Sequence, residues 1–113
     1  VLMLGYLRVM PEQVVDVYEG HIVNLHPALL PNYGGKGMYG HFVHEAVTAN
    51  GDKVSGLSLH RVRSVYDEGE ILYQENIELG DGCTAQECEL KVRQLESERV
   101  APALRQLIES NAI

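Results

Sequence analysis

With 113 residues, 45% of them hydrophobic and 22% charged, the chain has the composition of one ordinary globular domain or of part of a larger one. Its 16 acidic and 9 basic residues give a net charge of −7, and no run of Lys or Arg interrupts this excess, so nucleic acid is excluded as the main partner. No apolar stretch approaches the roughly 18 residues that a membrane span needs, and we expect no membrane partner.

The first residues form an apolar run, Val1-Leu2-Met3-Leu4, which is typical of a strand that is buried on both faces. The run does not begin with methionine. In a parallel α/β sheet the first strand is normally followed by a glycine-rich phosphate turn, and no Gly-x-Gly-x-x-Gly sequence occurs in this chain. We therefore expect that further sequence precedes Val1.

A proline opens the next predicted element. Pro11 and the apolar residues that follow it at helical spacing predict a short amphipathic helix, which ends at Gly20. Residues 22–25 are apolar apart from one asparagine and predict a second strand. A strand, a helix and a strand in succession predict a βαβ unit whose two strands are parallel neighbours.

A glycine-rich loop and a helix come next. The loop over residues 27–40 has four glycines within residues 34–40, so its backbone can turn tightly or approach a ligand closely. A helix is predicted over residues 41–50, because Asn50-Gly51 is a common C-terminal stop. Its predicted apolar face consists of Phe42, Val43, Ala46, Val47 and Ala49.

Two strands and a long helix complete the predicted elements. Residues 54–65 predict a strand, and a turn connects it to an antiparallel strand over residues 70–79. Alternation places Leu57, Leu59 and Arg61 on one face of the first of these strands and Ser58, His60 and Val62 on the other.

The last predicted helix begins at Thr84, which forms a capping box with Glu87. Pro102 lies inside this helix, where we expect a bend. The predicted apolar stripe consists of Leu90, Val92, Leu95, Val100, Leu104, Leu107 and Ile108.

The cysteine content indicates a reducing compartment. Cys83 and Cys88 lie close together with no other metal ligands nearby, so we expect free thiols and no bound metal. Together with the absence of a charged-then-apolar leader, this predicts a cytoplasmic protein.

The residues most suited to chemistry lie where the second strand ends. Asn24 and His26 fall on one face of that strand, so an amide N–H and an imidazole can converge on one carbonyl oxygen. Such donors stabilise the negative charge that develops when a nucleophile attacks the carbonyl, and His26 can also give a proton. The alternative is that both side chains simply satisfy nearby backbone groups, as polar residues at strand ends often do.

The same residues carry a resemblance to a known family. Asn24-Leu25-His26-Pro27-Ala28-Leu29-Leu30-Pro31 resembles the N-[IL]-H-P-[SA]-L-L-P motif of the folate-dependent formyltransferases. Residues 4–8 resemble the strand before that motif, residues 56–60 the strand after it, and residues 67–72 the catalytic aspartate loop. The glycine-rich segment 34–40 resembles the loop found in one branch of the family.

The resemblance implies an α/β fold with a formyltransferase-type, Rossmann-like sheet. Parallel strands would be followed by an antiparallel hairpin and a long C-terminal helix. Residues 1–113 would form the C-terminal, folate-binding and catalytic part of a formyltransferase domain. The phosphate-binding N-terminal half would be missing from the chain.

The resemblance also implies the reaction and the catalytic residues. A formyl group would pass from 10-formyltetrahydrofolate, as co-substrate, to the primary amine of glycinamide ribonucleotide in purine biosynthesis. Asn24 and His26 would polarise the formyl carbonyl, while Asp67 would manage removal of the amine proton through water. One anionic base and two donors are the minimal set for this chemistry. Without the resemblance, Asp67 would be read as a turn former.

Further roles come from the same match. Ser58 and His60 would support the site, with His60 holding the aspartate loop. Main-chain atoms of Arg8, Val9 and Met10, together with Asn24, would bind the folate. Each of these residues also has an ordinary structural interpretation, such as a strand histidine with one hydrogen-bond partner.

A helix glutamate would contact the ribonucleotide substrate. Aligning from upstream assigns this role to Glu96, whereas aligning from Pro102 shifts the match to Ser97. A solvated acid on a helix is the alternative interpretation of Glu96.

Other activities stay open. A formyltransferase that acts on tRNA would carry a basic extension, which this acidic chain lacks. A formyltetrahydrofolate hydrolase shares the same three catalytic residues, and a non-catalytic folate-binding remnant would keep only part of the site. Small molecules are the expected partners, and the oligomeric state is not predicted.

Overall fold

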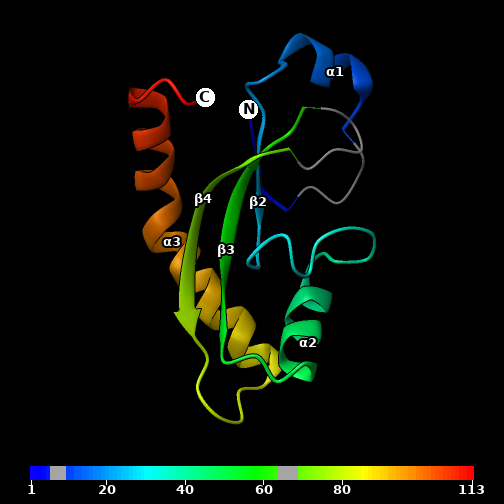
Figure 1. The fold of residues 1–113 in the computed structure, drawn as a ribbon, viewed down its shortest axis with the longest axis vertical. Coiled ribbons are helices and arrows are strands. Elements are labelled where there is room, and N and C mark those ends of the chain that lie inside the picture. Colours follow the sequence, from blue (N-terminus) through cyan, green and yellow to red (C-terminus); the bar gives the residue numbers. More distant parts are fainter. Residues whose placement is uncertain (6–9, 64–68) are drawn as a thin grey trace.

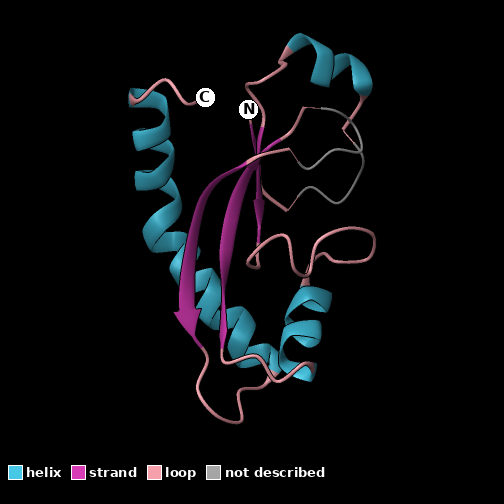
Figure 2. Cartoon of the chain, in the orientation of Figure 1, coloured by secondary structure: helices cyan, strands magenta, loops and turns pink. Residues whose placement is uncertain are grey.

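The computed structural model describes residues 1–5, 10–63 and 69–113. In chain order its elements are β1 (Leu2–Met3), α1 (Glu12–Val17), β2 (Val23–His26), α2 (His41–Ala49), β3 (Val54–Arg61), β4 (Ile71–Glu78) and α3 (Ala85–Glu109), as Figures 1 and 2 show. Every element that the sequence predicted within these residues is present. β3 ends at Arg61 and is therefore shorter than the strand predicted over residues 54–65.

The four strands form one sheet in the order β1-β2-β3-β4. β1 and β2 are parallel, whereas β2, β3 and β4 are antiparallel neighbours. The βαβ unit, the hairpin and the long last helix are thus confirmed, and with them the predicted fold class. The prediction that the first strand is buried on both faces is wrong: Leu2 and Met3 are half-buried, since β1 is an edge strand of the described sheet and has only β2 beside it.

The two faces of the sheet are covered differently. Leu57 and Leu59 of β3 are fully buried against α3, which contributes Leu95, Val100 and Ala103. On the opposite face, α1 packs Val15 against Ile22 and Val62. In Figure 1 α3 accordingly runs along one side of the sheet, while α1 lies on the other. Removing such apolar surface from water stabilises the fold by about 25 cal/mol per Å².

Helix α3 begins with the predicted capping box, in which the Thr84 hydroxyl accepts from the Glu87 backbone N–H. Its predicted apolar stripe is partly wrong. Leu90 and Ile108 are 62% and 60% exposed, and the buried positions include Cys88 and Ala103 instead. Both cysteines are free thiols, as expected. None of the helices in the described part of the chain combines the length and apolar character that crossing a bilayer requires.

Helix α2 also presents a different face from the predicted one. Val43 and Val47 are buried as expected, but Phe42 is 43% exposed and Ala49 is exposed. The polar His44 takes a place in the core instead, because its ring meets the buried Cys88 of α3. Phe42 packs on the surface, edge-on against Tyr39.

One buried cation connects the ends of the fold. The side chain of Arg61, at the end of β3, donates to the backbone carbonyls of Gly20 and Ala112. Its Nε also donates to Glu70 at 2.6 Å. The guanidinium therefore connects three segments to the end of β3: the residues after α1, the residues after α3 and the residue before β4. A planar guanidinium with several donors suits this role.

We predict that the Arg61–Glu70 ion pair makes stability depend on acidity. The hydrogen bond from Arg61 and the charge of Arg61 hold the pKa of Glu70 below its ordinary value of 4.5. Its contribution to the free energy of unfolding is therefore complete above that value and is lost as the pH falls through the lower folded pKa. Chemical denaturation should show that Glu70→Gln is less stable than the unchanged protein above about pH 4.5, with a difference that disappears at lower pH.

The exposed Glu19 provides the control. Glu19→Gln removes the same charge without touching Arg61 and should leave stability nearly unchanged. Equal effects of the two substitutions would show that the ion pair does not stabilise the fold.

Candidate functional site

The register between β2 and β3 brings the candidate residues together. Asn24 lies directly opposite His60, and His26 lies directly opposite Ser58. Residues paired across antiparallel strands have side chains on the same face, so these four form one row on the face away from α3. We call this surface, made of Asn24, His26, Ser58 and His60, the site face. The prediction that Ser58 and His60 share a face is confirmed.

Asn24 is held by its cross-strand partner. Its amide Nδ2 donates to Nε2 of His60 across 2.9 Å. An amide nitrogen only donates, so His60 Nε2 accepts in this arrangement and the ring proton lies on Nδ1. An amide nitrogen carries two hydrogens, and one of them suffices for this bond. His60 therefore orients Asn24 by binding one of the two amide hydrogens of Asn24.

His26 is held by the loop that follows it. The ring Nε2 lies 2.7 Å from the backbone carbonyl oxygen of Tyr33. A carbonyl oxygen only accepts, so Nε2 carries a proton. A partner on one ring nitrogen is the usual way in which a protein selects the histidine tautomer. The side chain is 8% exposed and is therefore fixed inside the protein wall.

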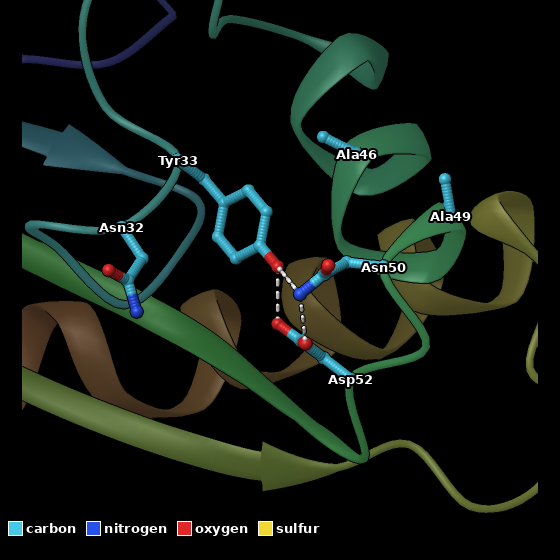
Figure 3. Close-up of a pocket in the computed structure, with 6 residues that line it drawn as sticks. All are labelled: Asn32, Tyr33, Ala46, Ala49, Asn50 and Asp52. Atoms are coloured by element: carbon cyan, nitrogen blue, oxygen red, sulfur yellow. Dashed lines mark hydrogen bonds between the residues drawn. The ribbon is translucent and has the colours of Figure 1, made fainter.

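Tyr33 connects the site face to a neighbouring cavity, shown in Figure 3. Its hydroxyl donates to Asp52 at 2.5 Å and accepts from Asn50 at 3.0 Å. Asn50 also donates to Asp52, which closes a triangle of hydrogen bonds. The open cavity of about 680 Å³ is lined by Asn32, Tyr33, Ala46, Ala49, Asn50 and Asp52. These contacts hold the loop against the end of α2 and the start of β3.

The described residues bring together only part of the predicted site. Asp67, Arg8 and Val9 lie outside them. Met10 is half-buried and packs against the cluster of Val15, Ile22 and Val62.

Glu96 is half-buried on α3, and burial raises the pKa of its carboxyl above the ordinary value. α3 packs against the face opposite the site face, so the fold does not place Glu96 beside Asn24 or His26. Its predicted substrate contact stays a prediction.

Three residues with a place around the site were missed by sequence reasoning. Tyr33 was noted only as part of a glycine-rich loop, yet its carbonyl binds His26. Gln74 of β4 donates to Ser58 across the next strand pair. His44 lies 3.6 Å from the sulfur of Cys88, and burial lowers the pKa of this histidine. Among the described residues no group of three or more His, Cys, Asp or Glu side chains could hold a metal ion.

Comparison with known proteins adds independent information. The family model described as formyl transferase matches residues 1–104. A chloroplastic phosphoribosylglycinamide formyltransferase from Vigna unguiculata is 38% identical over the whole chain, which spans 36% of that protein. The phosphoribosylglycinamide formyltransferase of Bacillus subtilis is 32% identical over 111 residues, which cover 98% of the chain and 54% of that protein.

The same likeness is seen in three dimensions. The crystal structure of phosphoribosylglycinamide formyltransferase from Bacillus halodurans superposes with a TM-score of 0.81 at 29% identity, covering 95% of this chain and 53% of that one. The chain thus spans between about a third and about half of the length of these relatives.

We predict that Tyr33→Phe lowers the free energy of unfolding by about 1 kcal/mol at neutral pH, the usual net value of one hydrogen bond. The hydrogen bond to Asp52, followed by burial, raises the pKa of Tyr33 above 10.0. The contribution is therefore complete below pH 10.0 and is lost as the pH rises through the raised folded pKa. Chemical denaturation from about pH 7 to about pH 11 measures this difference.

Tyr39→Phe is the matched control, since Tyr39 lies in the same loop and is 47% exposed. It should change stability by less than about 0.5 kcal/mol, as exposed substitutions usually do. A Tyr33→Phe protein as stable as the Tyr39→Phe protein would mean that the loop does not depend on Asp52.

Proposed function

Because the chain belongs to the formyl transferase family, we propose that it takes part in transfer of a formyl group from 10-formyltetrahydrofolate to the amine of glycinamide ribonucleotide, a step of purine biosynthesis. The observation that supports this most is the site face, where an amide and a protonated imidazole nitrogen lie on adjacent inward positions of one strand. The similarity to phosphoribosylglycinamide formyltransferases supports the choice of acceptor.

The proposed chemistry follows from what each group can donate or accept. The amine nitrogen attacks the formyl carbon, and a C–N bond forms as the carbonyl oxygen becomes negative. Asn24 and His26 donate hydrogen bonds to that oxygen. The bond from the formyl carbon to the folate nitrogen then breaks, the folate nitrogen takes up the proton that the amine gave to Asp67, and tetrahydrofolate leaves.

Proton removal is assigned to a carboxylate. The attacking amine must lose a proton once the new bond forms, and Asp67 would accept it through a water molecule. This role rests on the match of Asp67 to the family's aspartate loop, since residues 64–68 lie outside the described residues. No step of the proposal needs a metal ion.

Both proposed donors have partners within the protein. His26 Nε2 donates to the Tyr33 carbonyl, and Asn24 donates to His60. A formyl oxygen would be received by the second hydrogen of Asn24 and by His26, which in its doubly protonated form can donate from one ring nitrogen while the other stays on the Tyr33 carbonyl.

We also propose contacts to the two substrates, chiefly from residues outside the site face. Main-chain atoms of Arg8, Val9 and Met10, with Asn24, would bind the folate, and Glu96 would contact the ribonucleotide. Because Glu96 is half-buried on the helix that covers the other face, its proposed contact requires a substrate that extends past the sheet. The proposed partners are small molecules.

The compartment is a further proposal. Free thiols at Cys83 and Cys88 fit a reducing environment, and we propose the cytoplasm. The similar protein of Vigna unguiculata is chloroplastic. Expression of a fluorescent fusion of the protein would decide the compartment directly.

We predict that Asn24→Ala, His26→Ala and Asp67→Asn each lower formyl transfer by about a hundredfold or more, as loss of one oxyanion donor or of a proton acceptor usually does. The purified protein is given 10-formyltetrahydrofolate and glycinamide ribonucleotide, and formation of tetrahydrofolate and of the formylated nucleotide is followed. Folate binding should survive in His26→Ala, because the substitution removes a transition-state donor. His21→Ala is the matched control, because His21 is exposed and lies before β2 begins.

The acceptor distinguishes the activities that share this site. Transfer requires glycinamide ribonucleotide, whereas a formyltetrahydrofolate hydrolase releases formate in its absence, and a folate-binding remnant binds the donor without turnover. Unchanged rates in all three variants would refute the assignment of the catalytic residues.

A further inference from the structure

A buried hydroxyl lies beneath the loop that carries the motif. Ser58 is completely buried. Its Oγ donates to the carbonyl of Ala28 at 2.7 Å and accepts the N–H of Leu30 at 3.0 Å. A hydroxyl has one donor and two acceptor positions, so one acceptor position remains after these two bonds. Ser58 therefore holds both ends of the short segment 28–30.

Gly56 supports the same segment from the next inward position of β3. An added Cβ there would lie 2.8 Å from Cδ2 of Leu29 and would also meet the backbone of Glu75. Only a residue without a side chain allows Leu29 to pack this closely on the strand. The segment is thus held by close packing as well as by hydrogen bonds.

The remaining acceptor position of Ser58 is filled from β4. Gln74 lies opposite Ser58 in the β3–β4 register, and its Nε2 donates to Ser58 Oγ at 3.0 Å. The same nitrogen donates to the carbonyl of Leu30 at 2.7 Å. Both amide hydrogens of Gln74 and the whole capacity of the Ser58 hydroxyl are then in use.

The orientation of this amide is unusual for its position. Gln74 lies on an edge strand of the described sheet and is exposed, so water is available to satisfy its amide. The amide nevertheless turns inward, to the Leu30 carbonyl and to the Ser58 hydroxyl, which already has two other partners. A buried carbonyl without a partner is costly, so the bond to the carbonyl of the buried Leu30 favours the inward orientation.

The effect of this contact extends to His26. Leu30 is followed after two residues by Tyr33, whose carbonyl accepts the proton of His26 Nε2. The segment 28–33 is therefore held at one end by Ser58 and Gln74 and, at the other end, touches the imidazole. Because only Pro31 and Asn32 separate Leu30 from Tyr33, the position of Leu30 bears on the position of this acceptor.

We propose that Gln74 is a positioning residue of the formyl-transfer site, which holds through Leu30 and Ser58 the loop whose Tyr33 carbonyl orients His26. The proposal rests on the proposed function, in which His26 is a catalytic residue. The proposal goes beyond that function, because Gln74 is an exposed residue of β4 that touches neither the substrate nor the reacting atoms.

The first experiment uses Gln74→Met, which keeps the length of the side chain and removes its donors. Gln94→Met is the control, because Gln94 is an exposed helix residue whose amide donates only to Glu98 among the described residues. Nuclear magnetic resonance of isotope-labelled histidine follows the solvent exchange of the His26 ring N–H in the protein without substrate. Gln74→Met should speed this exchange by about tenfold or more, since exchange follows local opening of the hydrogen bond.

The second experiment measures turnover. Gln74→Met should lower kcat by about tenfold and change the KM for 10-formyltetrahydrofolate by less than about twofold, because a misplaced group affects the transition state more than binding. Gln94→Met should leave both parameters unchanged. A purely structural role would lower the amount of folded protein and leave kcat per folded molecule as it was.

Serine variants on the same strand test the connection independently. Ser58→Ala removes the partner of Gln74 and should speed exchange of the His26 N–H in the same way. Ser55→Ala is its control, because Ser55 is equally buried on the same strand but faces Cys88 of α3 on the side away from the site face. This pair gives a result even if Gln74→Met folds poorly.

The outcomes separate the two proposals. If the unchanged protein shows no turnover, the proposed function fails, and the exchange of the His26 N–H still decides the role of Gln74. If Gln74→Met and Gln94→Met give the same exchange rate, Gln74 does not position His26. Faster exchange with unchanged kcat also overturns the proposal, since the orientation of His26 would then not matter for the reaction.

Discussion

The antiparallel register of β2 and β3 is the constraint on which the site depends. It places Asn24 opposite His60, which holds it directly, and His26 opposite Ser58, which holds the loop segment 28–30 that follows β2. A one-residue shift of β3 would turn Ser58 and His60 to the face that α3 covers and away from Asn24 and His26. The buried Leu57 and Leu59 oppose such a shift, because it would move them out of the apolar contact with α3. Packing on one face therefore maintains the polar row on the other.

The two interpretations of the Asn-x-His pair are both visible in the fold. His26 does satisfy a backbone carbonyl, that of Tyr33, as a polar residue at a strand end often does. This bond also determines which ring nitrogen carries a proton and where the ring lies. Local satisfaction and preparation for catalysis are therefore compatible, since a rigid support is what a catalytic donor requires. The support comes from ordinary groups: a carbonyl, a serine and a glutamine.

Much of the fold could be predicted from the sequence, because it depends on patterns within short segments. Alternation along residues 54–61 places Leu57 and Ser58 on opposite faces, and Thr84 with Glu87 marks the start of α3. Errors arise where burial depends on a partner from elsewhere in the chain. Leu90 and Ile108 match a helical stripe but extend beyond the surface that α3 covers, and His44 is buried because Cys88 meets it. β1 is apolar throughout, yet its burial depends on what lies beside it.

The sequence by itself determined the order of the elements, the face shared by Asn24 and His26, and membership of the formyl transferase family, since each of these is written in local spacing and residue type. Only the tertiary structure decided which groups hold those two side chains. His60 is separated from Asn24 by 36 positions, and Gln74 from Leu30 by 44. Contacts over such distances follow from strand register and loop path, and no pattern within one segment specifies them. The hydrogen-bonded support of the site is therefore a property of the folded chain.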